Sequence, residues 1–180
     1  WPAEQPVHGT LDAKWQQGRL TLPEFNLQAG ESDFHITGSG DFDPDQKILK
    51  AELNWQSLQW PLAAAQPIVR SDSGQLKVTG HPEDWTVAGS LHMQAGNWPQ
   101  GNLIVSGHGN LESVQLQIQQ GAVLGGQFAG QASYSWVDQR PWSADLTARN
   151  LDVTALAGGY PLVISGNVIA NGLVKSNTLA

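Results

Sequence analysis

Val114-Gln-Leu116-Gln-Ile118 decides the fold class of this chain, because apolar and polar residues alternate in it without interruption. Successive side chains of a β-strand point to opposite faces of a sheet, so this spacing gathers the three apolar side chains on one face. The glutamines between them face the other way. The stretch therefore predicts a strand in a sheet with one apolar and one polar face.

The same alternation continues outward from this stretch in both directions. It is clearest in 34–42, 51–55, 76–80, 87–95, 103–107, 128–136, 142–148 and 164–170. Turn-type residues separate these runs at the short intervals that are typical of an antiparallel meander, and we expect about twelve strands. Glycines in the apolar phase, such as Gly38, Gly89 and Gly130, favour bends that let a sheet curl strongly.

Helical patterns are almost absent. Two short segments, 61–66 and 153–157, have some helical character, and Pro67 and Gly158-Gly159 would end them. Neither is long enough to cover a sheet, so no helix is available to pack on the apolar side chains. We predict an all-β fold: a long, curled and twisted antiparallel sheet whose apolar inner face forms an open groove, a β-taco, with minimal helix.

Composition and charge exclude several classes of protein. Charged residues make up 14% of the chain and the net charge is −7, so there is no basic surface for nucleic acid. An acidic chain is also not attracted to anionic lipid head groups. The absence of cysteine excludes disulfides and thiolate metal sites. No run approaches the ~20 apolar residues of a membrane helix, and the opening Trp1-Pro-Ala-Glu4 is no signal peptide, so we expect targeting elements outside this piece.

An internal repeat organises the chain. Residues of roughly 20–80 recur as roughly 114–172, with Phe34 and Pro67 in the first unit corresponding to Phe128 and Pro161 in the second. The alignment runs toward both ends of the chain without an obvious cap. We therefore predict that residues 1–180 form one repetitive β segment of a longer array.

No motif in the sequence points to catalysis or to a cofactor. The five histidines form no metal-binding or catalytic pair, and there is no nucleophile elbow or nucleotide loop. Asp41-x-Asp43-x-Asp45 copies the acidic spacing of a calcium loop, but Gln46 stands where the sharp turn requires glycine. We interpret it as a hairpin turn. The chain is expected not to be an enzyme, although carboxylates brought together by folding stay open.

The eight tryptophans allow two interpretations. They could form a platform on which sugar rings stack, or they could fill the apolar face. Trp55, Trp136 and Trp142 stand in phase with the apolar positions, which favours filling.

The phase of the alternation also assigns a candidate binding face. Its proposed groove residues are Leu53, Trp55, Leu76, Val78, Leu91, Met93, Leu103, Val105, Leu116, Ile118, Phe128 and Leu146. The assignment depends on phase alone, so a one-residue bulge would turn some of these side chains to the other face.

Two other architectures would use the same alternation. A β-sandwich module that binds glycans or a protein ligand would bury the apolar face sheet on sheet. A transmembrane barrel would place aromatic girdles at both strand ends, whereas the tryptophans here are scattered along the sequence. The repeat favours an open array.

Several segments together resemble a known family. They are 128–136, Pro141-Trp142, 146–151 and Pro161-Leu-Val-Ile-Ser-Gly166, with their counterparts in the first repeat. The chain resembles the AsmA-like superfamily and, within it, the TamB proteins of Gram-negative envelopes. The likeness covers most of the chain and consists of a repeated texture rather than one sharp motif.

This resemblance implies a location and a function. Such proteins are anchored in the inner membrane by an N-terminal helix, span the periplasm as a curled sheet, and are thought to pass phospholipid acyl chains along an apolar groove toward the outer membrane. They are also tied to outer-membrane protein assembly. The implied partners are phospholipid acyl chains, adjoining repeats of the same chain and an outer-membrane barrel protein. A continuous apolar face without a polar group that would hold the lipid suits this role. An acyl chain that leaves a bilayer is already out of water, so it can slide along such a face at little cost in free energy.

Overall fold

The computed structural model describes residues 7–29, 33–60, 69–95, 99–137, 140–154 and 156–173. These residues form eleven β-strands and no helix. The strands are β1 (Val7–Gln16), β2 (Arg19–Ala29), β3 (His35–Asp43), β4 (Ile48–Trp60), β5 (Val69–His81), β6 (Asp84–Ala95), β7 (Gly101–Gly109), β8 (Ser113–Val123), β9 (Gly126–Ser135), β10 (Pro141–Asp152) and β11 (Val163–Leu173).

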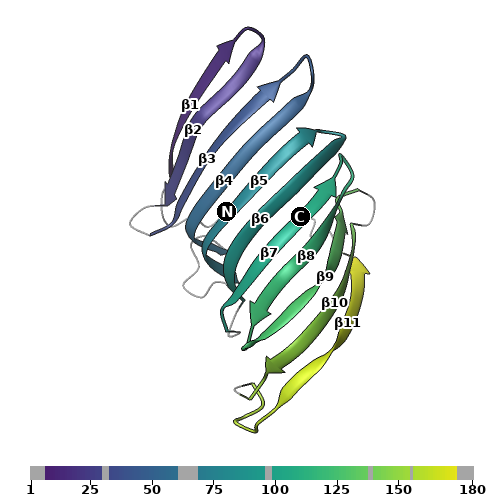
Figure 1. Ribbon diagram of the computed structural model, residues 1–180. Coiled ribbons are helices and arrows are strands. Elements are labelled where there is room, and N and C mark those ends of the chain that lie inside the picture. The colour runs from purple at the N-terminus through teal and green to yellow at the C-terminus, as the bar shows by residue number, and fades with distance from the viewer. Residues whose placement is uncertain are drawn as a thin grey trace, which may run out of the picture.

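The strands form one antiparallel sheet in chain order, from β1 at one edge to β11 at the other. Figure 1 shows them side by side as a single long layer, twisted and curved, with β1 in purple and β11 in yellow. Among the described strands β1 and β11 do not pair, so the sheet is open. The prediction of an all-β, curled, open sheet is confirmed, with eleven described strands where about twelve were expected.

The two expected helical segments have different outcomes. Segment 61–66 lies outside the described residues. Of segment 153–157, the described residues Thr154, Leu156 and Ala157 lie in turns, and the N–H of Ala157 donates to the carbonyl of Val153 over 2.9 Å. Gly158 and Gly159 have φ of 67° and 89°, a left-handed backbone that a right-handed helix cannot continue. No helix among the described residues is long and apolar enough to cross a membrane.

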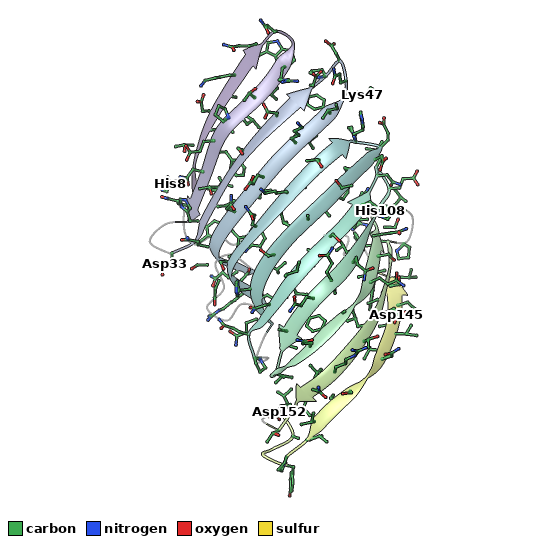
Figure 2. The ribbon with its side chains drawn as sticks, viewed as in Figure 1. His8, Asp33, Lys47, His108, Asp145 and Asp152 are labelled. Atoms are coloured by element: carbon green, nitrogen blue, oxygen red, sulfur yellow. The ribbon has the colours of Figure 1, made fainter. Side chains whose placement is uncertain are left out.

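The two long margins of the sheet differ in their connections. One margin carries the turns 17–18, 44–47, 82–83, 110–112 and 136–140, and the other carries 30–34, 61–68, 96–100, 124–125 and 153–162. We call the first the short-turn margin and the second the far margin. Figure 2 labels Lys47 and His108 near the short-turn margin and His8, Asp33 and Asp152 near the far margin.

No second layer of structure packs on the sheet in the part of the chain described (Figure 1). Phe34, 5% exposed, is the one buried hydrophobic side chain among the described residues, and none of the large side chains there is completely buried. The eleven strands also form one sheet and not two, so no β-sandwich exists within them. The sheet is stabilised by its backbone hydrogen bonds and by cross-strand pairs of side chains, and no other layer of the described residues covers its apolar face.

Candidate functional site

The strand register gathers the proposed groove residues on one face. Residues directly opposite each other on antiparallel strands project to the same side of the sheet, so a chain of paired residues forms a row across it. One row contains Val78 and Leu116, the next contains Leu53, Leu76, Val105, Ile118 and Leu146, and the third contains Trp55, Leu91, Leu103 and Phe128. Met93 pairs with Gly101 one step beyond the third row. These three rows are called the inner rows below.

All twelve side chains are half-buried, as expected for a face that only its own neighbours cover. The residues between them on the same strands, such as Gln115 and Gln117, are exposed on the opposite face. The structure therefore brings the twelve residues together. Their contact with lipid stays a prediction.

Large side chains on this face lie over glycines of the neighbouring strand. A Cβ atom at Gly74 would stand 2.0 Å from Cζ2 of Trp55, and one at Gly121 would stand 2.4 Å from Cζ of Phe128. Each ring thus covers the backbone of the strand beside it instead of standing upright. The pairing of a glycine with a large neighbour protects the exposed backbone, and it makes the apolar face smooth.

Ser71 holds one of the groove residues in place. The indole Nε1–H of Trp55 donates to Ser71 Oγ over 2.8 Å, and that hydroxyl lies 2.6 Å from the carbonyl oxygen of His92, to which it can donate. Ser71 is 5% exposed. Its role was missed from sequence, because a serine in a polar run carries no sign that a register shift between Arg70 and Ser73 turns it toward Trp55.

A row of paired residues, five of them aromatic, borders the apolar face along the short-turn margin. We define the aromatic row as the paired residues Trp15, Leu20, Phe42, Leu49, Gly80, Trp85, Gly109, Val114, Tyr134, Trp142 and Gly172, which crosses all eleven strands. Trp15, Trp85 and Trp142 are scattered along the sequence but stand in this one row, and Trp1 and Trp98 lie outside the described residues. A signal was available, since Trp15, Phe42, Trp85 and Trp142 each stand within three residues of a turn on the same margin.

The middle of this row is fixed by contacts around the turn 110–112. The rings of Trp85 and Trp136 stack with centroids 6.5 Å apart and planes 10° apart, and Tyr134 lies 6.4 Å from Trp136. The indole N–H of Trp85 donates to the carbonyl of Asn110 over 3.3 Å, and that of Trp136 donates to the carbonyl of Leu111. The aromatic rings are thus oriented with their polar edges toward the turn.

The opposite face carries hydroxyl, amide and charged side chains. Ser133 and Ser143 hydrogen-bond across β9 and β10 at 2.7 Å, and Lys77 forms a salt bridge with Glu52 at 3.3 Å. A hollow of about 910 Å³ on this side is lined chiefly by such groups, among them Gln115, Ser133 and Ser143. It offers hydrogen-bonding groups but no tryptophan, tyrosine or phenylalanine side chain, so it lacks the stacking surface expected of a sugar platform.

The acidic triplet lies at the β3–β4 hairpin, where the carboxylates of Asp41 and Asp43 bond to protein groups. Asp43 Oδ1 accepts the backbone N–H groups of Asp45 and Gln46, each over 3.1 Å, and Asp43 Oδ2 lies 3.1 Å from the guanidinium of Arg19. Asp41 accepts the hydroxyl of Thr21 over 3.0 Å. Among the described residues no group of three or more histidine, aspartate or glutamate side chains could hold a metal ion.

The Asp43 carboxylate is expected to stabilise this hairpin in a pH-dependent way. The N–H of Gln46 and the guanidinium of Arg19 hold the pKa of Asp43 below its ordinary value of 3.8. A lowered pKa contributes stability that is fully present above the ordinary value and is lost as the pH falls through the folded-state value. Asp43→Asn should therefore lower the thermal midpoint at neutral pH and flatten its decline on acidification. Thermal melts of both proteins down to about pH 2 test this. Glu83→Gln in the β5–β6 turn is the control, and an unchanged acid profile for Asp43→Asn would contradict the assignment.

Comparison with known proteins assigns the chain to a family. A search of solved structures found no match. The family model described as "TamB, N-terminal domain" matches residues 18–180, which is most of the chain and all of the sheet from within the β1–β2 turn onward. The chain therefore belongs to the TamB family of envelope-associated proteins.

Proposed function

We propose that the apolar face binds the acyl chains of phospholipids and forms part of a conduit that carries them through the periplasm toward the outer membrane. One observation carries the proposal: an apolar face that crosses all eleven strands and that nothing covers in the described part of the chain. Monomeric soluble proteins rarely expose continuous apolar patches of more than a few hundred Å², and larger ones mark sites of interaction.

The chemistry of the face suits transport better than tight capture. Across the three inner rows the side chains are aliphatic or aromatic, and the hydroxyl of Ser71 is already bonded to Trp55 and His92. An acyl chain of ~16 carbons gains on the order of 10 kcal/mol on leaving water, but almost nothing on leaving the interior of a bilayer. Since no free polar group on the three inner rows would hold the lipid in one place, such a chain can enter the face and slide along it.

Family membership supports the remaining features of the proposal. We propose that the whole protein is anchored in the inner membrane, that adjoining repeats continue this face, and that an outer-membrane barrel protein is its partner in outer-membrane protein assembly. We also propose that the segment is not an enzyme. Ser73 Oγ and His92 Nδ1 lie 3.1 Å apart, but this pair is exposed, and no carboxylate of the described residues is hydrogen-bonded to His92.

Lipid extraction tests the proposal directly. We expect the segment, purified from a Gram-negative host without detergent, to carry phospholipid at a near-stoichiometric level when organic extracts are analysed by mass spectrometry. A β-sandwich protein of the same size serves as the control, because its apolar side chains are closed in a core. Phospholipid no higher than in the control would mean that another surface covers this face, and the proposal would fail.

A further inference from the structure

We infer that a phospholipid on this face lies along the strands, with its headgroup at the aromatic row and its acyl chains across the inner rows toward Met93. The inference rests on the proposed function and adds an orientation to it. The expected ligand is a two-chain phospholipid, and its headgroup is expected at the short-turn margin. Three independent features of the described residues support it.

The first feature is the chemistry of the aromatic row. Tryptophan and tyrosine have an apolar body and a polar edge, which is why they concentrate where the hydrocarbon of a bilayer meets the headgroups. Trp15 and Trp142 are 62% and 37% exposed, and the N–H groups of Trp85 and Trp136 already point to the turn. Along the far margin the described residues include no such row: Phe34 is buried, and Tyr160, 79% exposed, lies in the 153–162 connection outside the strands.

The second feature is the length of the apolar surface along each strand. On β6, Val87, Leu91 and Met93 belong to the apolar face, and the distance from Val87 to Met93 is about 20 Å at the rise of a β-strand. The hydrocarbon of one bilayer leaflet is about 15 Å thick, half of the whole core. An acyl chain that starts beside the aromatic row therefore ends on the apolar face and does not reach past the far margin.

The third feature is the charge on the turns of the short-turn margin. Lys47 and Arg140 are exposed there, and neither forms a salt bridge with a described residue. Glu83 and Glu112 are exposed on neighbouring turns of the same margin. Cations beside anions complement a zwitterionic headgroup, whose phosphate and amine carry opposite charges. Figure 2 shows Lys47 beyond the end of the β3–β4 hairpin, where it would meet a headgroup at the margin.

A depth-resolved quenching experiment tests the orientation. The chain has no cysteine, so Val114→Cys in the aromatic row and Leu103→Cys in the third inner row each accept a single bimane fluorophore. Each labelled protein is mixed with phosphatidylcholine that carries a nitroxide either close to the headgroup or near the chain end. The two sites are roughly 20 Å apart along the strands. We therefore expect the quenching of bimane fluorescence by each nitroxide lipid to differ about twofold or more between the two sites. The headgroup-proximal nitroxide should quench the Val114 site more, and the chain-end nitroxide should quench the Leu103 site more.

The possible outcomes separate the orientation from the function on which it rests. The opposite order of quenching, or equal quenching of both sites by both lipids, overturns the orientation while lipid binding stands. No quenching at either site, with far-UV circular dichroism unchanged, removes the proposed function as well. A bimane signal that depends on protein concentration and not on lipid would mean that a second copy of the chain covers the face. Leu49→Cys in the aromatic row and Leu91→Cys in the third inner row provide a second pair, in case one of the first variants does not fold.

Discussion

Gly130→Val is expected to destabilise the sheet by about 3 kcal/mol or more and to disrupt the pairing of β9 with β10. A Cβ atom at this position would stand 2.1 Å from the carbonyl oxygen of Asp145 and 2.9 Å from Cα of Leu146. Both are backbone atoms of the neighbouring strand, so relief requires the strands to separate. The φ of 156° at Gly130 adds strain for any residue with a side chain. Valine is otherwise a favourable strand residue, and steric conflict therefore decides the result.

Gly166→Val is the matched control for this substitution. Gly166 lies on the same face in β11, and a Cβ atom there would have no heavy atom within 4 Å. We expect its urea midpoint to stay close to that of the parent protein, whereas the Gly130→Val midpoint should fall by about 1 to 2 M in equilibrium unfolding followed by circular dichroism. Similar midpoints for the two variants would show that the close approach of β10 to Gly130 is not tight in solution.

Leu116→Asp is expected to reduce phospholipid binding roughly a hundredfold with little loss of sheet content. Leu116 lies on the face between Gly107 and Ala132, and it is half-buried without being part of a closed core. A carboxylate beneath an acyl chain costs about 2.5 to 3.5 kcal/mol, as it does at the centre of a membrane helix, and each 1.4 kcal/mol is a factor of ten in affinity. Without lipid the same carboxylate meets water, which is why the strand should survive.

The control is Gln115→Asp, which adds the same charge one residue away on the polar face of β8. Phospholipid recovered by extraction and mass spectrometry should fall for Leu116→Asp and stay unchanged for Gln115→Asp. Leu91→Asp on β6 should behave like Leu116→Asp. If Leu116→Asp and Leu91→Asp instead unfold the protein, the face is a closed core, and the proposal of an open groove is wrong.

The sequence was sufficient to predict the sheet and its apolar face, because alternation is a local property of each strand. Val114 to Ile118 pairs without interruption with Gly109 to Val105 on β7 and with Tyr134 to Gly130 on β9, as the pattern requires. Bulges are the places where phase alone fails. On β8 the register shifts between Ile118 and Gly121, so Gly121 lies on the apolar face although strict alternation would put it on the polar one.

The sequence carries a signal for aromatic residues near the turns, but their alignment in one row and the hydrogen bond of Trp55 to Ser71 could not be predicted, for a different reason. Both depend on which residues of different strands stand opposite each other, and that register follows from turn geometry and bulges at many separate points. Trp15 and Trp142 are far apart in sequence and belong to one row only because every intervening strand keeps its register. The curvature of the sheet, which brings Trp85 to Trp136 across two strands, is likewise the sum of many small twists.

The sequential strand order has a consequence for how such a molecule is made and lengthened. Among the described strands, substantial contacts occur only between neighbours in the chain, so each strand pairs with the strand that precedes it. Each hairpin can add itself to the growing edge as it is synthesised or exported, and low contact order of this kind favours rapid folding. Insertion or loss of one hairpin changes the length of the face by about 10 Å and leaves the alternation of every other strand intact. The span of the molecule can therefore evolve by steps of two strands, without redesign of its surface.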